Sequence, residues 1–171
     1  MPKPKLWLLG HGRAAECLCR MGALVGFDVV VDDPMAEPER YPEAARLIGD
    51  DFDYKQLTPG PVDYVIVATQ HKGDHQSMLR ALRSPAPFIA LIASAKRAGL
   101  VLAYLREEGV AEADLARVHA PAGLDLGAKT PEEIALSVLS EIVMHRRGGN
   151  SRVMREKLRS PTSRDAVTAA A

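Results

Sequence analysis

The stretch from Lys5 to Asp33 constrains the fold more than any other part of the chain, because it joins two apolar runs through a glycine-rich turn. The first run, Leu6–Leu9, has no polar residue, which is typical of a strand buried on both faces of a parallel sheet. The six residues from Gly10, GHGRAA, fit the G-x-G-x-x-G/A pattern of dinucleotide-binding turns. A strand, a turn and a helix in this order predict the first part of a doubly wound α/β domain.

The small residues of this turn have predicted roles. Gly10 permits a sharp turn, Gly12 lets a phosphate approach the backbone, and Ala15 lets the helix lie close to the strand. The helix predicted to begin at Arg13 directs unpaired N–H groups and the positive end of its dipole at the same place. We therefore count the whole turn, with His11 and Arg13, as candidate ligand-binding residues.

An acidic pair ends the second apolar run, Phe27–Val31. The first acid, Asp32, lies about 20 residues after Gly10, where dinucleotide-binding domains place the carboxylate that accepts hydrogen bonds from ribose hydroxyls. Asp32 is therefore the predicted ribose ligand. The alternative is a domain that needs Gly10 and Gly12 only for the backbone of the turn and binds no nucleotide.

Further apolar runs predict the rest of the sheet. Val62–Thr69, Phe88–Ala93 and Leu115–His119 have the length of buried strands, and Tyr41–Ile48 is a candidate short helix. Together they predict one domain, residues 1–147, with a Rossmann-like parallel sheet of about five strands in the order 3-2-1-4-5. In that order the fourth predicted strand, Phe88–Ala93, lies beside the first.

Polar residues follow the carboxyl ends of two predicted strands, where open α/β sheets bind ligands. Thr69 and His71 follow the third strand, and we expect hydrogen bonding from His71 in preference to metal binding. Ser94 and Lys96 follow the fourth strand at the start of a helix. A hydroxyl and a cation at a helix start suit an anionic ligand.

A second informative loop is His119–Gly127, HAPAGLDLG. Its two glycines and one proline leave few flexible side chains, as expected where a ligand approaches the backbone closely. The residues Thr130–Glu133, TPEE, form a capping box that predicts the start of the last long helix.

Composition excludes several kinds of partner. The chain of 171 residues has 22 basic and 22 acidic residues, so its net charge of zero argues against binding to nucleic acid or a membrane surface. Met1–Pro4 lacks an apolar signal region and no apolar run approaches the roughly 20 residues of a membrane span, so we expect a cytoplasmic protein. Residues 148–171 are basic, and we expect a flexible tail or a contact surface for an acidic partner.

Three stretches carry a resemblance to a known family: GHGRAAECLCRMGALVGFDVVVDDP, RSPAPFIALIASAKRAGLVLAYLREEGV and RVHAPAGLDLGAKTPEEIALSVLSEIV. The last is the most specific, because fold requirements alone do not dictate its HAPxGLDLGAxTPEEIA block. Over about Lys5–Arg147 the chain resembles the C-terminal Rossmann domain of the XdhC/CoxI family, the xanthine dehydrogenase accessory factors.

The resemblance implies a role in maturing molybdenum hydroxylases of the xanthine or carbon monoxide dehydrogenase type. Family members are thought to hold the molybdenum cofactor, a pterin phosphate or dinucleotide, and to help load its sulfurated form into the apo-enzyme; they are usually dimers. The resemblance places the cofactor pocket at glycines and polar residues of the strand ends and loops: Gly10, Gly12, Asp32, Thr69, Ser94, His119, Gly123, Asp125 and Gly127.

The chain departs from the family pattern in three respects. Ala90 and Ala93 stand where glycines are usual, and the loop Gln70–Gly73 lacks the acidic residues that members often have there. The sequence also starts at the Rossmann strand, without the N-terminal domain whose cysteine takes part in cofactor handling. We therefore expect cofactor binding and delivery, with sulfuration left to a separate partner such as a sulfurtransferase.

Two other classes of function stay open. One is a small NAD(P)-dependent oxidoreductase, in which Asp32 favours NAD and either His71 or His119 serves as the general acid. The other is a nucleotide-responsive protein with a regulatory or assembly role, in which the basic tail from Arg152 contacts the partner.

Overall fold

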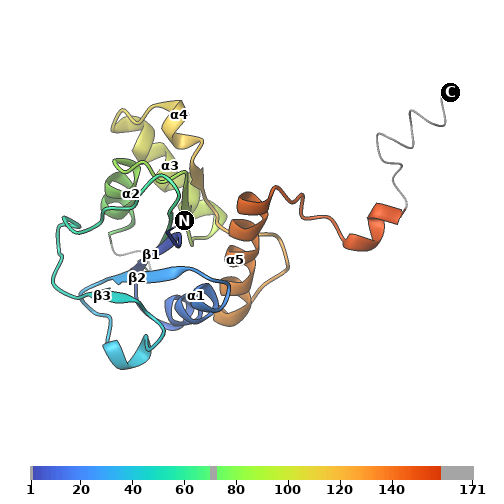
Figure 1. Cartoon of the computed structure of the whole chain (residues 1–171). Coiled ribbons are helices and arrows are strands. Elements are labelled where there is room, and N and C mark those ends of the chain that lie inside the picture. The colour runs from blue at the N-terminus through green and yellow to red at the C-terminus, as the bar shows by residue number, and fades with distance from the viewer. Residues whose placement is uncertain (1, 70–72, 159–171) are drawn as a thin grey trace.

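Six parallel strands form one sheet in the order β3-β2-β1-β4-β5-β6 in the part of the chain that the structure describes (Figure 1). This computed structural model describes residues 2–69 and 73–158. The strand order is that of a doubly wound nucleotide-binding fold, so the predicted fold class is confirmed. In chain order the strands are β1 (Lys5–Gly10), β2 (Asp28–Asp32), β3 (Arg46–Ile48), β4 (Tyr64–Ala68), β5 (Phe88–Leu91) and β6 (Val118–His119).

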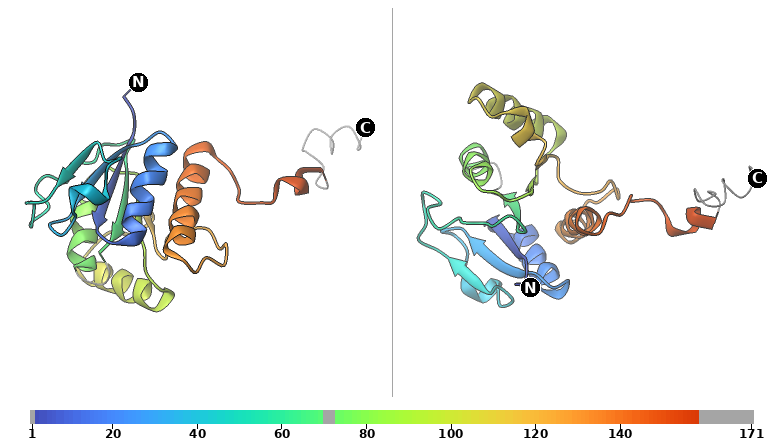
Figure 2. Two further views of the ribbon diagram at one scale, coloured as in Figure 1. Left: turned by 90° about the horizontal axis from the view of Figure 1, so that it is seen from below. Right: turned by 45° about the horizontal axis from the view of Figure 1, so that its top comes forward.

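Helices cover both faces of the sheet, and α1 lies beside α5 on one of them (Figure 2). Helices α2 and α3 pack together on the other face. The long helices are α1 (Arg13–Leu24), α2 (Asp74–Leu82), α3 (Ala95–Glu107) and α5 (Pro131–Arg147); α4 (Glu112–Leu115), η1 (Pro38–Arg40) and η2 (Met154–Leu158) are single turns. Among the described residues, none of these helices combines the length and the apolar character needed to cross a membrane.

The sheet separates two apolar cores because successive side chains of a strand point to opposite faces. Leu6 and Leu8 of β1 face the core under α1 and α5. Trp7 and Leu9 face the core under α2 and α3. All four are buried, which explains why the run Leu6–Leu9 has no polar residue.

Two predictions about the sheet are wrong. Tyr41–Ile48 is not a helix, since its last three residues form the edge strand β3, which is too short to show a periodic pattern. The expected neighbour of the first strand, Phe88–Ala93, lies one place further out, because β4 pairs with β1 and β5 pairs with β4. The sheet consequently has six strands in place of about five.

Gly10 ends β1 where the backbone of β4 is nearest. Its φ is +135°, and a Cβ atom added there would lie 2.1 Å from the carbonyl oxygen of Ala68. No side chain fits in that gap. The first glycine of the turn is therefore required by the contact between β1 and β4, before any ligand is considered.

Asp32 ends β2 inside the protein. Its side chain is fully buried, and neither carboxyl oxygen has a hydrogen-bond partner among the described residues. Burial raises the pKa of this carboxyl to about 7, and the nearby Asp51 carboxylate acts in the same direction. Asp32 therefore takes up a proton at a far higher pH than an exposed aspartate does.

Replacing Gly10 by alanine should destabilise the fold far more than the same change at Gly26. Both residues have positive φ, but a Cβ at Gly26 would meet no atom within 4 Å. We expect a loss of about 1–2 kcal/mol for Gly26→Ala from backbone strain, and a further loss of about 3 kcal/mol for Gly10→Ala from the clash with β4. Urea unfolding measures both, and equal losses would contradict the close β1–β4 contact.

The substitution Asp32→Asn should change how stability depends on pH. A carboxyl whose pKa is raised by folding stabilises the protein below its unfolded pKa of about 4, and this contribution is lost as the pH rises through about 7. Between about pH 5 and about pH 8 the wild type should lose on the order of a few kcal/mol relative to Asp32→Asn. Urea unfolding at the two pH values tests this, and parallel profiles for the two proteins would contradict it.

Candidate functional site

A hollow of about 770 Å³ lies over the carboxyl ends of β1, β4 and β5. These three strands contribute His11 from the turn after β1, Ala68 from the end of β4, and Ile92 to Ser94 from the chain after β5. The loop before α5 and the first turns of α1 and α5 complete the wall. This is the edge of the sheet at which open α/β folds bind their ligands.

Small and aliphatic side chains make most of this wall. They are Ala14, Ala68, Ile92, Ala93, Ala122, Leu124, Leu126, Ala128 and Ile134. A few polar residues also line it: His11, Ser94, Asp125 and Ser137. A mainly apolar hollow with few polar groups is typical of a small-molecule site.

The N-terminus of α1 opens beside this hollow. Gly12 is the N-cap residue, with φ of +100°, and it has no side chain to cover the first amides of the helix. His11 lines the 770 Å³ hollow and also a second hollow of about 370 Å³. Gly12, Arg13 and Arg40 are among the residues that line this second hollow. A helix start between two hollows is suited to an anionic group that belongs to a larger ligand.

The acid that contacts the turn is Asp33. Its Oδ1 lies 3.2 Å from Nδ1 of His11 and accepts a hydrogen bond of 2.7 Å from the backbone N–H of Met35. Asp32 lines neither hollow, and its oxygens are covered in this conformation. The proposal that Asp32 binds ribose hydroxyls stays a prediction.

A buried carboxylate, Asp74, joins three elements next to the hollow. Its Oδ1 accepts the hydroxyl hydrogen of Thr69 after β4, and its Oδ2 accepts a 2.8 Å hydrogen bond from Nε of Arg97 on α3. Ser94 caps α3, because its Oγ accepts the backbone N–H of Arg97. Thr69 and Ser94 thus have structural partners, and of the two Ser94 also lines the hollow.

One predicted residue, Lys96, lies apart from this geometry, because it is exposed on the first turn of α3 and does not line the hollow. Another, Arg13, lines the smaller hollow, where its Nε donates a 2.7 Å hydrogen bond to Glu132 and so ties α1 to α5. The prediction for His71 falls outside the described residues.

Glu141 of α5 holds the loop His119–Gly127 in place on the side that faces this helix. One carboxylate oxygen accepts the N–H of Gly123 at 2.8 Å, and the other lies 2.9 Å from Nδ1 of His119. The His119 ring also stacks on Phe88, with centroids 3.8 Å apart. His119 therefore packs under the loop and does not line the hollow.

Gly123 and Gly127 play different parts in this loop. A Cβ at Gly123 would lie 2.2 Å from Oγ of Ser137, so the residue lets the loop lie against α5. Gly127 and Asp125 line the hollow, where a Cβ at Gly127 would meet no atom within 4 Å. The predicted convergence of the β1 turn and this loop on one hollow is therefore present.

Sequence reasoning missed Glu141, although a signal was available. Glu141 lies between the buried residues Leu139 and Ile142 on α5, and a carboxylate on the inner side of a helix needs a partner. Its partners lie about twenty residues earlier in the chain, so only the folded structure identifies them.

Comparison with known proteins gives concordant results. Residues 6–142 match the XdhC Rossmann domain family. The chain is 37% identical over 147 residues to the uncharacterized protein YqeB of Escherichia coli K12, a match that covers 82% of this chain and 27% of YqeB. It is 33% identical over 153 residues to a Bacillus subtilis 168 protein named as a probable xanthine dehydrogenase component, covering 85% of this chain and 44% of that protein.

A solved structure agrees with the sequence comparisons. A crystal structure described as a xanthine dehydrogenase from Bacillus halodurans superposes with a TM-score of 0.75 and 26% identity, covering 88% of this chain and 44% of that one. The chain thus spans less than half the length of each of these relatives. The family resemblance seen in the sequence is confirmed, and the chain belongs to the XdhC Rossmann domain family.

Proposed function

We propose that this domain binds the molybdenum cofactor in the 770 Å³ hollow and supports its delivery to a molybdenum hydroxylase of the xanthine dehydrogenase type. The observation that carries the proposal is the position of the hollow beside the uncovered start of α1. A flat ring system that bears a phosphate needs both parts of this arrangement, a helix start for the phosphate and a roomy hollow for the ring.

The start of α1 suits the phosphate. The backbone N–H groups of the first turn and the helix dipole attract an anion, and glycine at the N-cap lets it approach the backbone. His11 adds a ring nitrogen next to the same turn, oriented by Asp33. These groups bind a phosphate without recognising what is attached to it, so the selectivity for the cofactor must come from the hollow.

The hollow suits the ring system. Its alanines leave room for a flat heterocycle, and the hydroxyls of Ser94 and Ser137 and the Asp125 carboxylate supply hydrogen-bonding groups of the kind that a pterin pairs with. Glu141 fixes the loop that carries Asp125 and Gly127. The residues present therefore fit the cofactor, which when bound supplies the molybdenum centre of the enzyme that receives it.

The relatives support the choice of partner. The Bacillus subtilis protein is named a probable component of xanthine dehydrogenase, and the Bacillus halodurans structure carries the same enzyme name. We infer that this domain acts with a molybdenum hydroxylase as binding and delivery component, and that a separate sulfurtransferase supplies the sulfur. The chain's own residues then have to bind, orient and shield the cofactor.

The oxidoreductase alternative receives less support. NAD binding relies on a carboxylate that takes the ribose hydroxyls. The oxygens of Asp32 are buried, and Asp33 already accepts a backbone hydrogen bond and contacts His11. NADH is consequently the natural competitor ligand in a binding experiment.

Adding bulk to the wall of the hollow should weaken binding while the fold is kept. We expect the wild type to bind isolated molybdopterin saturably in a fluorescence titration, and Ala93→Leu, which adds bulk at the hollow, to bind at least about tenfold more weakly, a loss of about 1.4 kcal/mol. The matched control is Ala103→Leu on the exposed side of α3, which should bind like the wild type.

The outcomes of this titration are distinct. Saturable binding of NADH without binding of molybdopterin would favour the oxidoreductase class. No binding of either ligand, or equal binding by Ala93→Leu and the wild type, would contradict the proposed site.

A further inference from the structure

A further hollow, of about 500 Å³, lies between the end of α2 and the segment 54–59, and we call it the α2 recess. Its lining residues come from the parts of the chain that precede β4 and β5, so it lies towards the amino ends of these strands. The 770 Å³ hollow lies over their carboxyl ends, and the two share no lining residue. The α2 recess is therefore separate from the proposed cofactor site.

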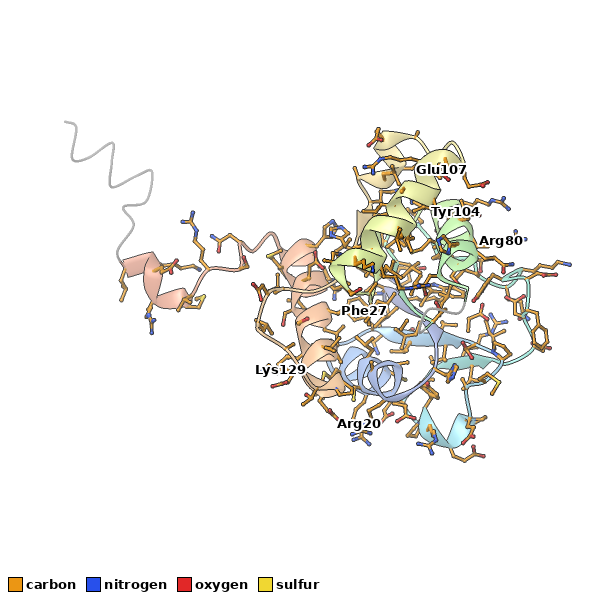
Figure 3. The ribbon with its side chains drawn as sticks, turned by 180° about the vertical axis from the view of Figure 1, so that it is seen from behind. Arg20, Phe27, Arg80, Tyr104, Glu107 and Lys129 are labelled. Carbon is orange, nitrogen blue, oxygen red and sulfur yellow. The ribbon has the colours of Figure 1, made fainter. Side chains whose placement is uncertain are left out.

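Three cations line the α2 recess, and they come from two segments. Arg80 projects from the last turn of α2 (Figure 3), and Arg83 follows at the C-cap of this helix. A cation at a helix end is favourable by itself, because the negative end of the helix dipole lies there. Lys55 has no such explanation, since it belongs to the segment before β4.

The three cations lack a counter-charge within the protein. Of the described residues that line the α2 recess none is acidic, and no ion pair within residues 2–69 and 73–158 involves any of the three. Elsewhere on the surface, arginines pair with glutamates of neighbouring segments, at 2.7 Å for Arg13 and at 3.1 Å for Arg20 and Arg106. A recess lined by charges of one sign attracts an ion of the opposite sign from solution.

A strained tyrosine keeps Lys55 at this place. Tyr54 has a φ of +53°, a left-handed conformation that bulky residues rarely adopt. Its hydroxyl accepts a 2.9 Å hydrogen bond from Oγ of Ser77 on α2, and Asp51 accepts one of 2.8 Å from the backbone N–H of Lys55. Such strain persists only where surrounding contacts maintain it. The backbone that carries Lys55 is thus fixed against α2 before any ligand binds.

We propose that the α2 recess binds a small phosphate monoester with a compact apolar body. A phosphate monoester carries about 1.5 to 2 negative charges at neutral pH, and guanidinium groups bind its oxygens in pairs. Two arginines and a lysine match that charge better than they match a single carboxylate. Tyr54, Leu57 and Pro85 supply an apolar part of the wall for the body of the ligand. The volume lies within the range of small-molecule pockets.

A chemical-shift titration of the isotope-labelled chain locates binding residue by residue. With phenyl phosphate as the probe, we expect saturable shifts in 54–59 and 80–84, with a Kd below about 1 mM. Inorganic phosphate should shift the same residues but bind at least about threefold more weakly, because it lacks the apolar body. A Kd that is equal for the two probes would overturn the proposed ligand class.

Two variants test the part played by the cations. Arg80→Gln and Arg83→Gln should each bind phenyl phosphate at least about tenfold more weakly, with an unchanged thermal unfolding midpoint. The matched control is Arg20→Gln on α1, which removes the same charge elsewhere on the surface and should bind like the wild type (Figure 3).

The proposal is overturned if both recess variants bind as tightly as Arg20→Gln, or if shifts appear only outside 54–59 and 80–84. The first turn of α1 gives its own set of shifts in this experiment. Failure at the α2 recess is consequently distinguishable from failure of the proposed cofactor site.

Discussion

The close contact of β1 with β4 sets the geometry on which the site depends. At Gly10 the two backbones are so near that a single added carbon would overlap a β4 carbonyl oxygen. The chain must therefore turn sharply there, and the turn brings the start of α1 to the edge of the sheet, beside the hollow. Ligand access to the helix start is thus a consequence of how the central strands pack.

The sequence was sufficient to predict the elements that have strong local signals. Three short stretches contain a local signal for their own structure: the apolar run Leu6–Leu9, the glycine turn and the capping box at Thr130. All three structures are present. The family resemblance extended this to the loop from His119, whose residues converge with the β1 turn on one hollow. The resemblance placed these residues in one pocket, and the carboxyl ends of parallel strands do lie at one edge of the sheet.

Contacts between residues that lie far apart along the chain could not be predicted from the sequence. The three residues of β3 are a strand only because β2 lies beside them. Asp32 occupies the expected place for a ribose ligand, yet its side chain is buried beside Asp51. Glu141 holds His119 and Gly123, and nothing near Glu141 in the sequence indicates that pairing. In each case the partner lies at least sixteen residues away along the chain and is brought near by the fold.

The central claim is that particular backbone N–H groups bind a phosphorylated ligand. Amide hydrogen exchange with and without the ligand therefore tests it most directly. With molybdopterin added, the account predicts slower exchange in Gly12–Glu16 at the start of α1 and in Gly123–Gly127 of the loop. Exchange should be unchanged in Tyr104–Glu108, the C-terminal end of α3, which does not line the hollow. Slowing that is confined to other segments, or a profile identical with and without the ligand, would contradict it.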